Sequence, residues 1–271
     1  MRASFGREQL GMDVDWELRE TGPHEADHTV LLLPGGMCSA GSYAEVMAEP
    51  ALAGMRLVAA TLPGHAGAPP PDDYSIESYA SQTAALVTKI GADVVVGFSM
   101  GASVALEMVA SGGFTGPTVL LGISLSAKDE PAFFRAIVGL GAVLGGIPAA
   151  LLARGAASMV KRISVSTERR AELRDDFRRN VPQHMRLALR EYARWLHRYP
   201  HPAERLCQAN VPTWIVHAEK GDGDLTDDER RTLEACAHVH LVTIPGTVFF
   251  LPNEVPDRIA DVIVEAVGST R

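Results

Sequence analysis

The stretch VVVGFSMGASVALEM, residues 94–108, decides the fold of this chain. Its apolar run at 94–96 predicts a buried strand, and the small and apolar residues from position 100 onward predict a helix. Between them, the pattern G-x-S-x-G places Ser99 in a sharp turn, where Gly97 and Gly101 avoid the crowding that side chains would cause. The serine hydroxyl is then exposed at the positive end of a helix dipole, which favours developing negative charge.

Four other segments carry recurring patterns. Residues 31–36 (LLLPGG) are an apolar run that ends in a glycine turn, and residues 62–67 (LPGHAG) form a second glycine turn. Residues 211–217 (VPTWIVH) predict a further strand, and residues 244–246 (IPG) are followed by Phe250, Asn253, Glu254 and Pro256. Together with the serine turn, these segments resemble the α/β-hydrolase family over nearly the whole chain.

The resemblance implies a site built around Ser99 as the nucleophile. It also implies an oxyanion hole, in which backbone N–H groups stabilise a tetrahedral intermediate, at Met100 and at Gly36 or Met37. The alternative is a structural serine at a strand-to-helix turn. The strand, the helix and the other matching segments favour the nucleophile.

The acidic member of the site is predicted in the run EKGDGDLT, residues 219–226. Counting back from the end of this run places the acid at Asp222, whereas counting forward from the preceding strand places it at Gly221. Asp224 is the second choice. An ordinary acidic turn remains the competing interpretation, because Asp and Gly are also common loop residues.

The catalytic histidine that the resemblance implies is absent, since Phe249 occupies its position. In a complete triad the histidine takes the serine proton and the aspartate orients its ring. Phenylalanine has no proton acceptor, and a serine without a base is a poor nucleophile at neutral pH. The sequence therefore predicts an incomplete or atypical triad.

Other imidazoles are weak candidates for the missing base. His217 and His240 lie on predicted strands, where core or surface roles are commoner, and His65 lies in a turn that is structural in relatives. Three more lie in or beside a predicted cap: His184, His197 and His201. Cys38 follows the first glycine turn and is predicted to be a small buried hydrophobe.

The alternation of strands and helices predicts an α/β fold with a mainly parallel sheet flanked by helices. Strands are expected at 14–19, 29–33, 56–61, 94–98, 118–123, 213–217 and 240–244. Helices are expected at 75–90, 100–110, 227–237 and 255–267. The intervening segment is helical in pattern without strand signals. We therefore expect an α/β-hydrolase core over residues 1–127 and 206–271, with an inserted helical cap over residues 128–205.

Composition and charge limit the classes of partner that we expect for this chain. The 271 residues carry a net charge of −8, and no nucleic-acid-binding module is recognised, so we expect no nucleic-acid partner. Three widely spaced cysteines lack metal-ligand spacing, and no secretory signal is recognised. A reducing cytoplasm fits the cysteines best. We expect neither a metal ion nor a cofactor, and a small-molecule substrate or ligand; the oligomeric state is left open.

Two features of the predicted cap have alternative interpretations. Residues 136–153 contain no charge but five glycine or proline residues, so we expect a buried pair of broken helices beside a pocket rather than a membrane span. Residues 128–198 contain 14 Lys/Arg and 7 Asp/Glu, a net charge of +7 on an acidic body. This basic segment could steer an anionic partner, but a solvated helix surface is favoured.

Two function classes follow. The first is an esterase- or thioesterase-like serine hydrolase of a small, largely apolar acyl substrate. The second is a catalytically degenerate member that binds a small ligand or assists a non-hydrolytic step, such as a cyclisation. Ser99 and both glycines of its turn favour the enzyme, and Phe249 opposes ordinary hydrolysis.

Overall fold

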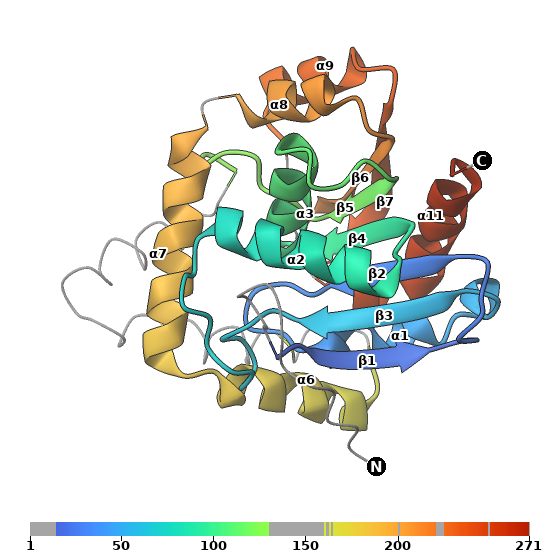
Figure 1. The fold of residues 1–271 in the computed structure, drawn as a ribbon, viewed down its shortest axis with the longest axis vertical. Helices are drawn as coiled ribbons and strands as arrows, with labels where there is room; N and C mark the ends of the chain where they lie inside the picture. The colour runs from blue at the N-terminus through green and yellow to red at the C-terminus, as the bar shows by residue number, and fades with distance from the viewer. Residues whose placement is uncertain are drawn as a thin grey trace.

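The structure, a computed structural model, describes residues 15–129, 160, 163, 165–199, 201–220, 225–248 and 250–270. Seven strands in this part of the chain form one sheet in the order β1-β3-β2-β4-β5-β6-β7 (Figure 1). β1 runs antiparallel to β3, and every other pair is parallel. The strands are β1 (Glu17–Thr21), β2 (Thr29–Leu33), β3 (Arg56–Thr61), β4 (Val94–Phe98), β5 (Thr118–Leu121), β6 (Thr213–Lys220) and β7 (Val239–Thr247).

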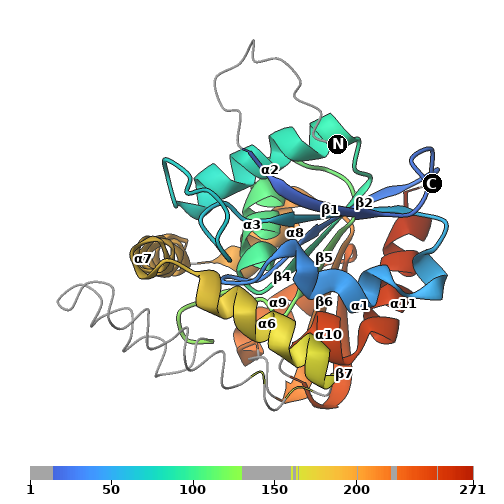
Figure 2. The ribbon, with the colours of Figure 1, turned by 90° about the horizontal axis from the view of Figure 1, so that it is seen from below.

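Helices cover both faces of this sheet (Figure 2). The first face carries α2 (Ile76–Ile90), α3 (Met100–Ala110), α7 (Pro182–Arg198), α8 (Pro202–Ala209) and α9 (Asp227–Glu234). The second carries α1 (Ala44–Met47), α10 (Leu251–Glu254) and α11 (Pro256–Gly268). The remaining elements are α6 (Thr167–Arg179) and the short 3-10 helices η1 (Ala40–Tyr43) and η2 (Pro50–Leu52).

The central strands are buried on both faces because their side chains alternate between two cores. In β2, Leu31 and Leu33 pack with α2 and α3, while Val30 and Leu32 pack on the side of α11. Such continuous apolar runs are typical of parallel strands that are covered on both faces. The predicted α/β class, with a mainly parallel sheet flanked by helices, is confirmed.

Local sequence explains where the principal helices begin and end. Ser75 accepts a hydrogen bond from the Ser78 N–H at the start of α2, and Gly91 ends that helix with a φ of 66°. At the start of α9, Thr226 and Glu229 form a reciprocal capping box.

A buried ion pair fixes α7 and α8 against α3. Glu107 of α3 is 3% exposed and accepts hydrogen bonds from Arg205 Nη1 and Nη2 at 2.9 and 3.1 Å. Trp195 Nε1 of α7 donates to the same carboxylate at 2.8 Å. The predicted domain boundary at residues 205 and 206 falls inside α8, so that helix runs across it.

The strands and helices depart from the predicted bounds in a few places. β1 begins later than predicted, and four of its five side chains are exposed, so it has little apolar alternation to mark it. β6 and β7 continue beyond their predicted ends because they pair with each other as far as Lys220 and Thr247.

The cysteines correct one prediction. Cys207 and Cys236 form a disulfide, whereas three reduced thiols were expected. They are 29 positions apart in the sequence, but α8 and α9 bring their Cα atoms to 5.8 Å. Cys38 is free and buried, as predicted. Because disulfides are rare in reducing compartments, the cysteines no longer support a cytoplasmic location, which stays a prediction.

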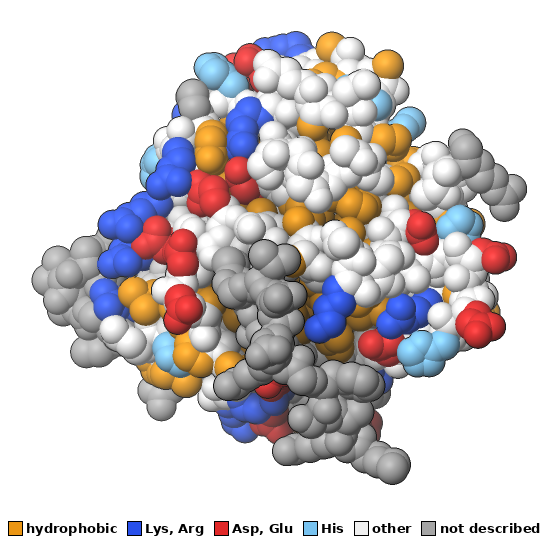
Figure 3. All heavy atoms as spheres, viewed as in Figure 1, with side chains coloured by type: hydrophobic (Ala, Val, Ile, Leu, Met, Phe, Trp, Pro, Cys, Tyr) orange, Lys and Arg blue, Asp and Glu red, His pale blue; other side chains and the backbone are white. Residues whose placement is uncertain are grey.

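Arginines of the basic segment are largely paired with acidic side chains. Figure 3 shows Lys and Arg interspersed with Asp and Glu over α7. Carboxylates lie within ion-pair distance of Arg169, Arg178, Arg179, Arg190, Arg194 and Arg198. The uncharged stretch 136–153 lies outside the described residues. Among the helices that the structure describes, none has the length and apolar character that a membrane span requires.

Candidate active site

Ser99 occupies a strained turn between β4 and α3. Its φ is 50° and its ψ is −116°, a conformation that residues with a Cβ rarely adopt. The Ser99 N–H donates to the Leu121 carbonyl of β5 at 2.9 Å, which ties the turn to the sheet. Ser99 is partly exposed, and its Oγ has no hydrogen-bond partner among the described residues. The predicted placement of Ser99 directly before the helix is confirmed.

The glycines on either side of Ser99 are required by close backbone contacts. A Cβ at Gly97 would lie 2.4 Å from the Gly101 carbonyl oxygen. A Cβ at Gly101 would lie 2.4 Å from the Leu33 carbonyl oxygen of β2. Both distances are far shorter than a van der Waals contact, so the turn closes only with glycine at these positions.

The loop after β2, residues 34–39, lies against the Ser99 turn. A Cβ at Gly35 would be 3.4 Å from the Ser99 Cβ, and one at Gly36 would be 3.3 Å from the Met100 Sδ. Within the described part of the chain, neither the Gly36 nor the Met100 N–H has a hydrogen-bond acceptor. The structure therefore brings together both segments predicted to supply oxyanion donors.

Met37 differs from Gly36 because its N–H already donates a hydrogen bond. It donates to His65 Nδ1 at 3.0 Å, from the loop after β3, residues 62–68. His65 is fully buried, and burial, with a smaller effect of His184, lowers its pKa to about 4. The neutral ring thus accepts at Nδ1 and carries its proton at Nε2, where no described residue accepts it. His65 thus connects the loops after β2 and β3, and its purely structural role stays a prediction.

Apolar side chains surround the loop after β2. Cys38 packs with Leu173 and Phe177 of α6, and burial raises the pKa of its thiol to about 12. The Phe250 ring packs 6.0 Å from that of Phe98 and 6.1 Å from that of Phe177, measured between centroids. An apolar cluster therefore lies against the loop after β2, and Cys38 remains a protonated thiol.

Asp222, Asp224 and Phe249 lie outside the described residues, and so does the segment 136–153 that is expected to lie beside a pocket. The chain on either side of them is described. The Val248 N–H donates to the Lys220 carbonyl at 2.9 Å, and the Gly246 N–H donates to Glu219 Oε2 at 3.0 Å. The ends of β6 and β7 are thus joined where the two predicted segments begin.

The other histidines are spread over the molecule. His240 is exposed and stacks on Trp214 at the beginning of β7, the opposite edge of the parallel strands from Ser99. His197 is exposed near the end of α7, and His184 packs against Tyr74. His217 is buried near the end of β6.

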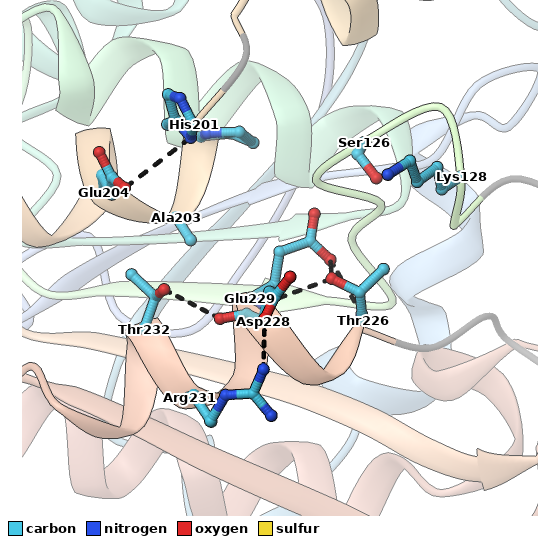
Figure 4. A pocket seen from close by; sticks show the side chains of 11 residues that line it. Ser126, Lys128, His201, Ala203, Glu204, Thr226, Asp228, Glu229, Arg231 and Thr232 are labelled. Carbon is cyan, nitrogen blue, oxygen red and sulfur yellow. Dashed lines mark hydrogen bonds and ion pairs between the residues drawn. The ribbon is translucent and has the colours of Figure 1, made fainter.

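A pocket of about 670 Å³ lies between α8, α9 and the chain after β5 (Figure 4). Burial, aided by the charge of Glu229, raises the pKa of the nearby Asp129 to about 6, although N–H groups of Leu125 and Ser126 oppose the shift. None of the predicted catalytic residues lines this pocket. Its lining is Ser126, Lys128, His201, Pro202, Ala203, Glu204, Thr226, Asp228, Glu229, Arg231 and Thr232.

Comparison with known proteins settles the family. The model of the Alpha/beta hydrolase family matches residues 30–262, which is most of the chain. The chain belongs to the alpha/beta hydrolase family. None of the curated protein sequences compared matches it significantly.

Solved structures of several other proteins have the same fold at low sequence identity. A thermophilic esterase from Thermogutta terrifontis is 18% identical, with a TM-score of 0.72 over 95% of this chain and 94% of that one. An N-acyl homoserine lactonase mutant bound to N-hexanoyl homoserine lactone is 16% identical, with a TM-score of 0.74 over 98% of each chain. The thioesterase domain from the curacin biosynthetic pathway is 19% identical, with a TM-score of 0.65 over 94% of this chain and 100% of that domain.

One group of residues beside the candidate site was not predicted from the sequence. Asp176 and Asn180, at the end of α6, hydrogen-bond to the loop after β2. No motif marks them, because their partners lie more than 100 positions away in the sequence. Among the described residues, no cluster of three His, Cys, Asp or Glu side chains is arranged to hold a metal ion.

Proposed function

We propose that this protein is a serine hydrolase of small, largely apolar acyl esters or thioesters, with an atypical proton relay. The observation that carries the proposal is the backbone of Ser99, which has a φ of 50° at the first turn of α3. Such strain persists only where the surroundings enforce it, and it is concentrated at functional sites. Here Gly97 and Gly101 provide the space that the strained turn needs.

The backbone around Ser99 supports stabilisation of an oxyanion. Met100 follows the serine directly and Gly36 lies against Met100, and neither N–H has an acceptor among the described residues. We propose Gly36 rather than Met37 as the second donor, since the Met37 N–H is bonded to His65. In such a site Ser99 Oγ attacks the acyl carbonyl carbon while water takes its proton, and each N–H stabilises the resulting oxyanion by about 3 kcal/mol. Collapse of this intermediate expels the alcohol or thiol, and water then hydrolyses the acyl-serine.

The proton relay is the atypical part. We propose Asp222 as the acid, because counting back from the end of the run 219–226 places the acid of the α/β-hydrolase pattern there. Asp224 is the second choice. Phe249 supplies no base. His65 does not replace it, since Nδ1 is bonded to Met37 and its low pKa of about 4 makes it a poor proton acceptor. Hydrolysis is therefore expected to be slow.

The apolar surroundings indicate the substrate class. Phe250 lies against Phe98, the residue before Ser99, and Met37 and Cys38 belong to the same apolar cluster. A short acyl chain would bury apolar surface there at about 25 cal/mol per Å², whereas a charged acyl group would lose its hydration without a partner.

Steady-state hydrolysis of 4-nitrophenyl acetate and butyrate, together with an acyl thioester, tests the proposal. We expect slow turnover that Ser99→Ala abolishes, and a covalent adduct at Ser99 after incubation with a fluorophosphonate, detected by mass spectrometry. Ser103→Ala is the matched control, because Ser103 is fully buried one turn further along α3. Equal turnover in the wild type and Ser99→Ala would contradict the proposal.

A second candidate is a ligand-binding or non-hydrolytic member of the family. The observation that favours it is the lack of a described hydrogen-bond acceptor for Ser99 Oγ, in apolar surroundings. Tight binding of an acyl ester without turnover and without a Ser99 adduct would select this alternative.

A further inference from the structure

The side-chain amide of Asn180 joins the loop after β2, which lies against the Ser99 turn, to the loop after β3. Asn180 follows α6 and is buried. Its Nδ2 donates to the Met37 carbonyl at 2.9 Å, in the loop after β2, and its Oδ1 accepts from the Ala66 N–H at 2.9 Å, in the loop after β3. Nδ2 also donates to the carbonyl of Asp176 in its own helix at 2.9 Å. One amide therefore connects three separate segments.

Both loop residues that bind Asn180 have a left-handed backbone. Met37 has a φ of 70° and Ala66 a φ of 47°. Only two other non-glycine residues in the described ranges share this property, Ser99 and Asn210. Because a Cβ disfavours this conformation, it persists where hydrogen bonds and packing hold it.

The hydrogen bonds around Met37 form a closed arrangement. Its N–H is bound by His65 Nδ1 and its carbonyl by Asn180 Nδ2, so both of its peptide groups are fixed. His65 and Ala66 are consecutive residues, and Ala66 is bound by the other end of the Asn180 amide. Gly36, the proposed oxyanion donor, directly precedes the peptide group that His65 fixes.

A neighbouring contact holds the same loop to α6. Asp176 Oδ2 accepts hydrogen bonds from the Ser39 N–H at 3.2 Å and from the Ser39 hydroxyl. Asp176 lies one helical turn before Asn180, so the two side chains lie on one face of the helix. The loop after β2 is consequently held at Met37 and Ser39 by an element outside the core sheet.

We propose that Asn180 is a positioning residue for the oxyanion hole: by holding Met37 and Ala66 in the left-handed conformation, it keeps the Gly36 N–H directed at the reacting carbonyl oxygen. This inference rests on the proposed hydrolase function. Asn180 acts through the loop and does not touch the substrate. Binding of the acyl group and orientation of the donor are therefore separable in the kinetics.

Two variants test the role. Asn180→Ala removes every hydrogen bond of the side chain, whereas Asn180→Asp keeps an acceptor for the Ala66 N–H but cannot donate to the Met37 carbonyl. Both should lower kcat by ~10–100-fold, up to the effect of losing one oxyanion donor, with KM changed less than ~3-fold. Arg178→Ala is the matched control, because Arg178 is an exposed residue of the same helix that pairs with Asp175.

Met37→Gly in the Asn180→Ala background separates positioning from simple anchoring of α6. Glycine adopts a φ of 70° without strain, so the loop no longer needs the amide to hold it. The double variant should recover at least ~3-fold in kcat. No recovery, with α6 intact by circular dichroism and thermal unfolding, would mean that Asn180 only anchors the helix, and would overturn the proposal.

Hydrogen exchange gives a readout that does not depend on turnover. Exchange at Cys38 should be at least ~10-fold faster in Asn180→Asp than in the wild type and Arg178→Ala, because its loop loses the donor to the Met37 carbonyl. Exchange at Ala66 should rise by as much in Asn180→Ala, which removes the acceptor of its N–H. Unchanged exchange would overturn the inference. A wild type that hydrolyses no ester or thioester, with faster exchange in Asn180→Asp, would refute the proposed function while leaving Asn180 as the residue that orders the loops.

Discussion

The Ser99 turn and the joined ends of β6 and β7 lie at the same edge of the sheet, the carboxyl ends of its parallel strands, but they contribute different kinds of group. Around Ser99 the structure depends on the backbone. Gly97 and Gly101 leave room for the turn because they have no Cβ, and the Gly36 and Met100 N–H groups are the candidate donors. At the ends of β6 and β7, the backbone joint through Val248 and Lys220 is also present. What that region was expected to contribute, however, is an imidazole at position 249, where the chain has phenylalanine.

The difference shows that the parts of such a site differ in how sensitive they are to a single substitution. An oxyanion donor is a backbone N–H, which survives a change of side chain as long as the turn keeps its shape. A general base is one side chain, which a single substitution removes. The framework that would position the base can therefore remain after the base itself has gone.

The largest expected effect comes from restoring the missing group. Phe249→His places an imidazole next to Phe250, in the segment joined to the end of β6. If Asp222 still faces this position, ester hydrolysis should rise by up to ~10²–10⁴-fold, the contribution of a positioned general base. The β-branched Val248 restricts the loop, so we expect a rise nearer the lower bound.

Three variants control this experiment. Phe249→Leu removes the ring without adding a base and should show no rise. Adding Ser99→Ala or Asp222→Asn to Phe249→His should abolish the gain. A folded Phe249→His protein with wild-type rates on esters and thioesters would show that the imidazole is not the only missing part, and would favour the ligand-binding alternative.

The second prediction disrupts the other side of the comparison. Gly97→Ala places a Cβ 2.4 Å from the Gly101 carbonyl oxygen, so the turn must open. We expect a loss of about 3 kcal/mol or more in the free energy of unfolding, measured with urea. Gly54→Ala should have little effect, since nothing lies within 4 Å of a Cβ there. Similar stabilities for both variants would contradict the requirement for glycine.

A third prediction concerns pH and the contact between the loops after β2 and β3. Folding lowers the pKa of His65 to about 4, so the folded protein resists the protonation that the unfolded chain undergoes near pH 6.5. The stability that depends on neutral His65 is fully present above pH ~7 and is lost as the pH falls toward 4. At pH 4.5 the free energy of unfolding should be lower by ~2–3 kcal/mol.

His65→Asn isolates that contribution, because the asparagine oxygen can accept from the Met37 N–H but does not titrate. Urea unfolding at pH 7.5 and 4.5 should show a steeper loss for the wild type than for this variant. Parallel losses would mean that His65 titrates normally in the folded protein.

The smallest expected effect compares two buried alanines. Ala66 has a φ of 47°, and Ala59 in β3 is equally buried in an extended strand. Ala59→Gly should cost about 1.5 kcal/mol through lost methyl burial and added chain entropy. In Ala66→Gly, relief of the left-handed strain offsets the same loss, so we expect a change below about 0.5 kcal/mol. Equal losses in thermal or urea unfolding would show that position 66 is not strained.

Sequence predicted the central strands and α3 almost residue by residue, since apolar runs end there at glycines or polar residues. It misplaced β1, whose exposed side chains give no alternating pattern. It also missed the Cys207–Cys236 pair, because only the packing of α8 against α9 brings the two thiols together.

The candidate site divides in the same way. Ser99 and its two glycines were predictable because the backbone geometry imposes a local pattern. Asn180 was not, since its role arises from loops 114 and 143 positions away. Residues whose function depends on distant partners leave no spacing to recognise.

The Cys207–Cys236 disulfide closes a covalent ring that contains β6, α9 and the predicted acid. A cross-link across 29 positions limits how far the denatured chain can spread, which in the loop-entropy account stabilises the native state by about 3–4 kcal/mol. A reductant restores that freedom to the denatured ensemble without removing any packed side chain. The stability of the fold therefore depends on the redox conditions around the protein, through a bond that takes no part in the predicted chemistry at Ser99.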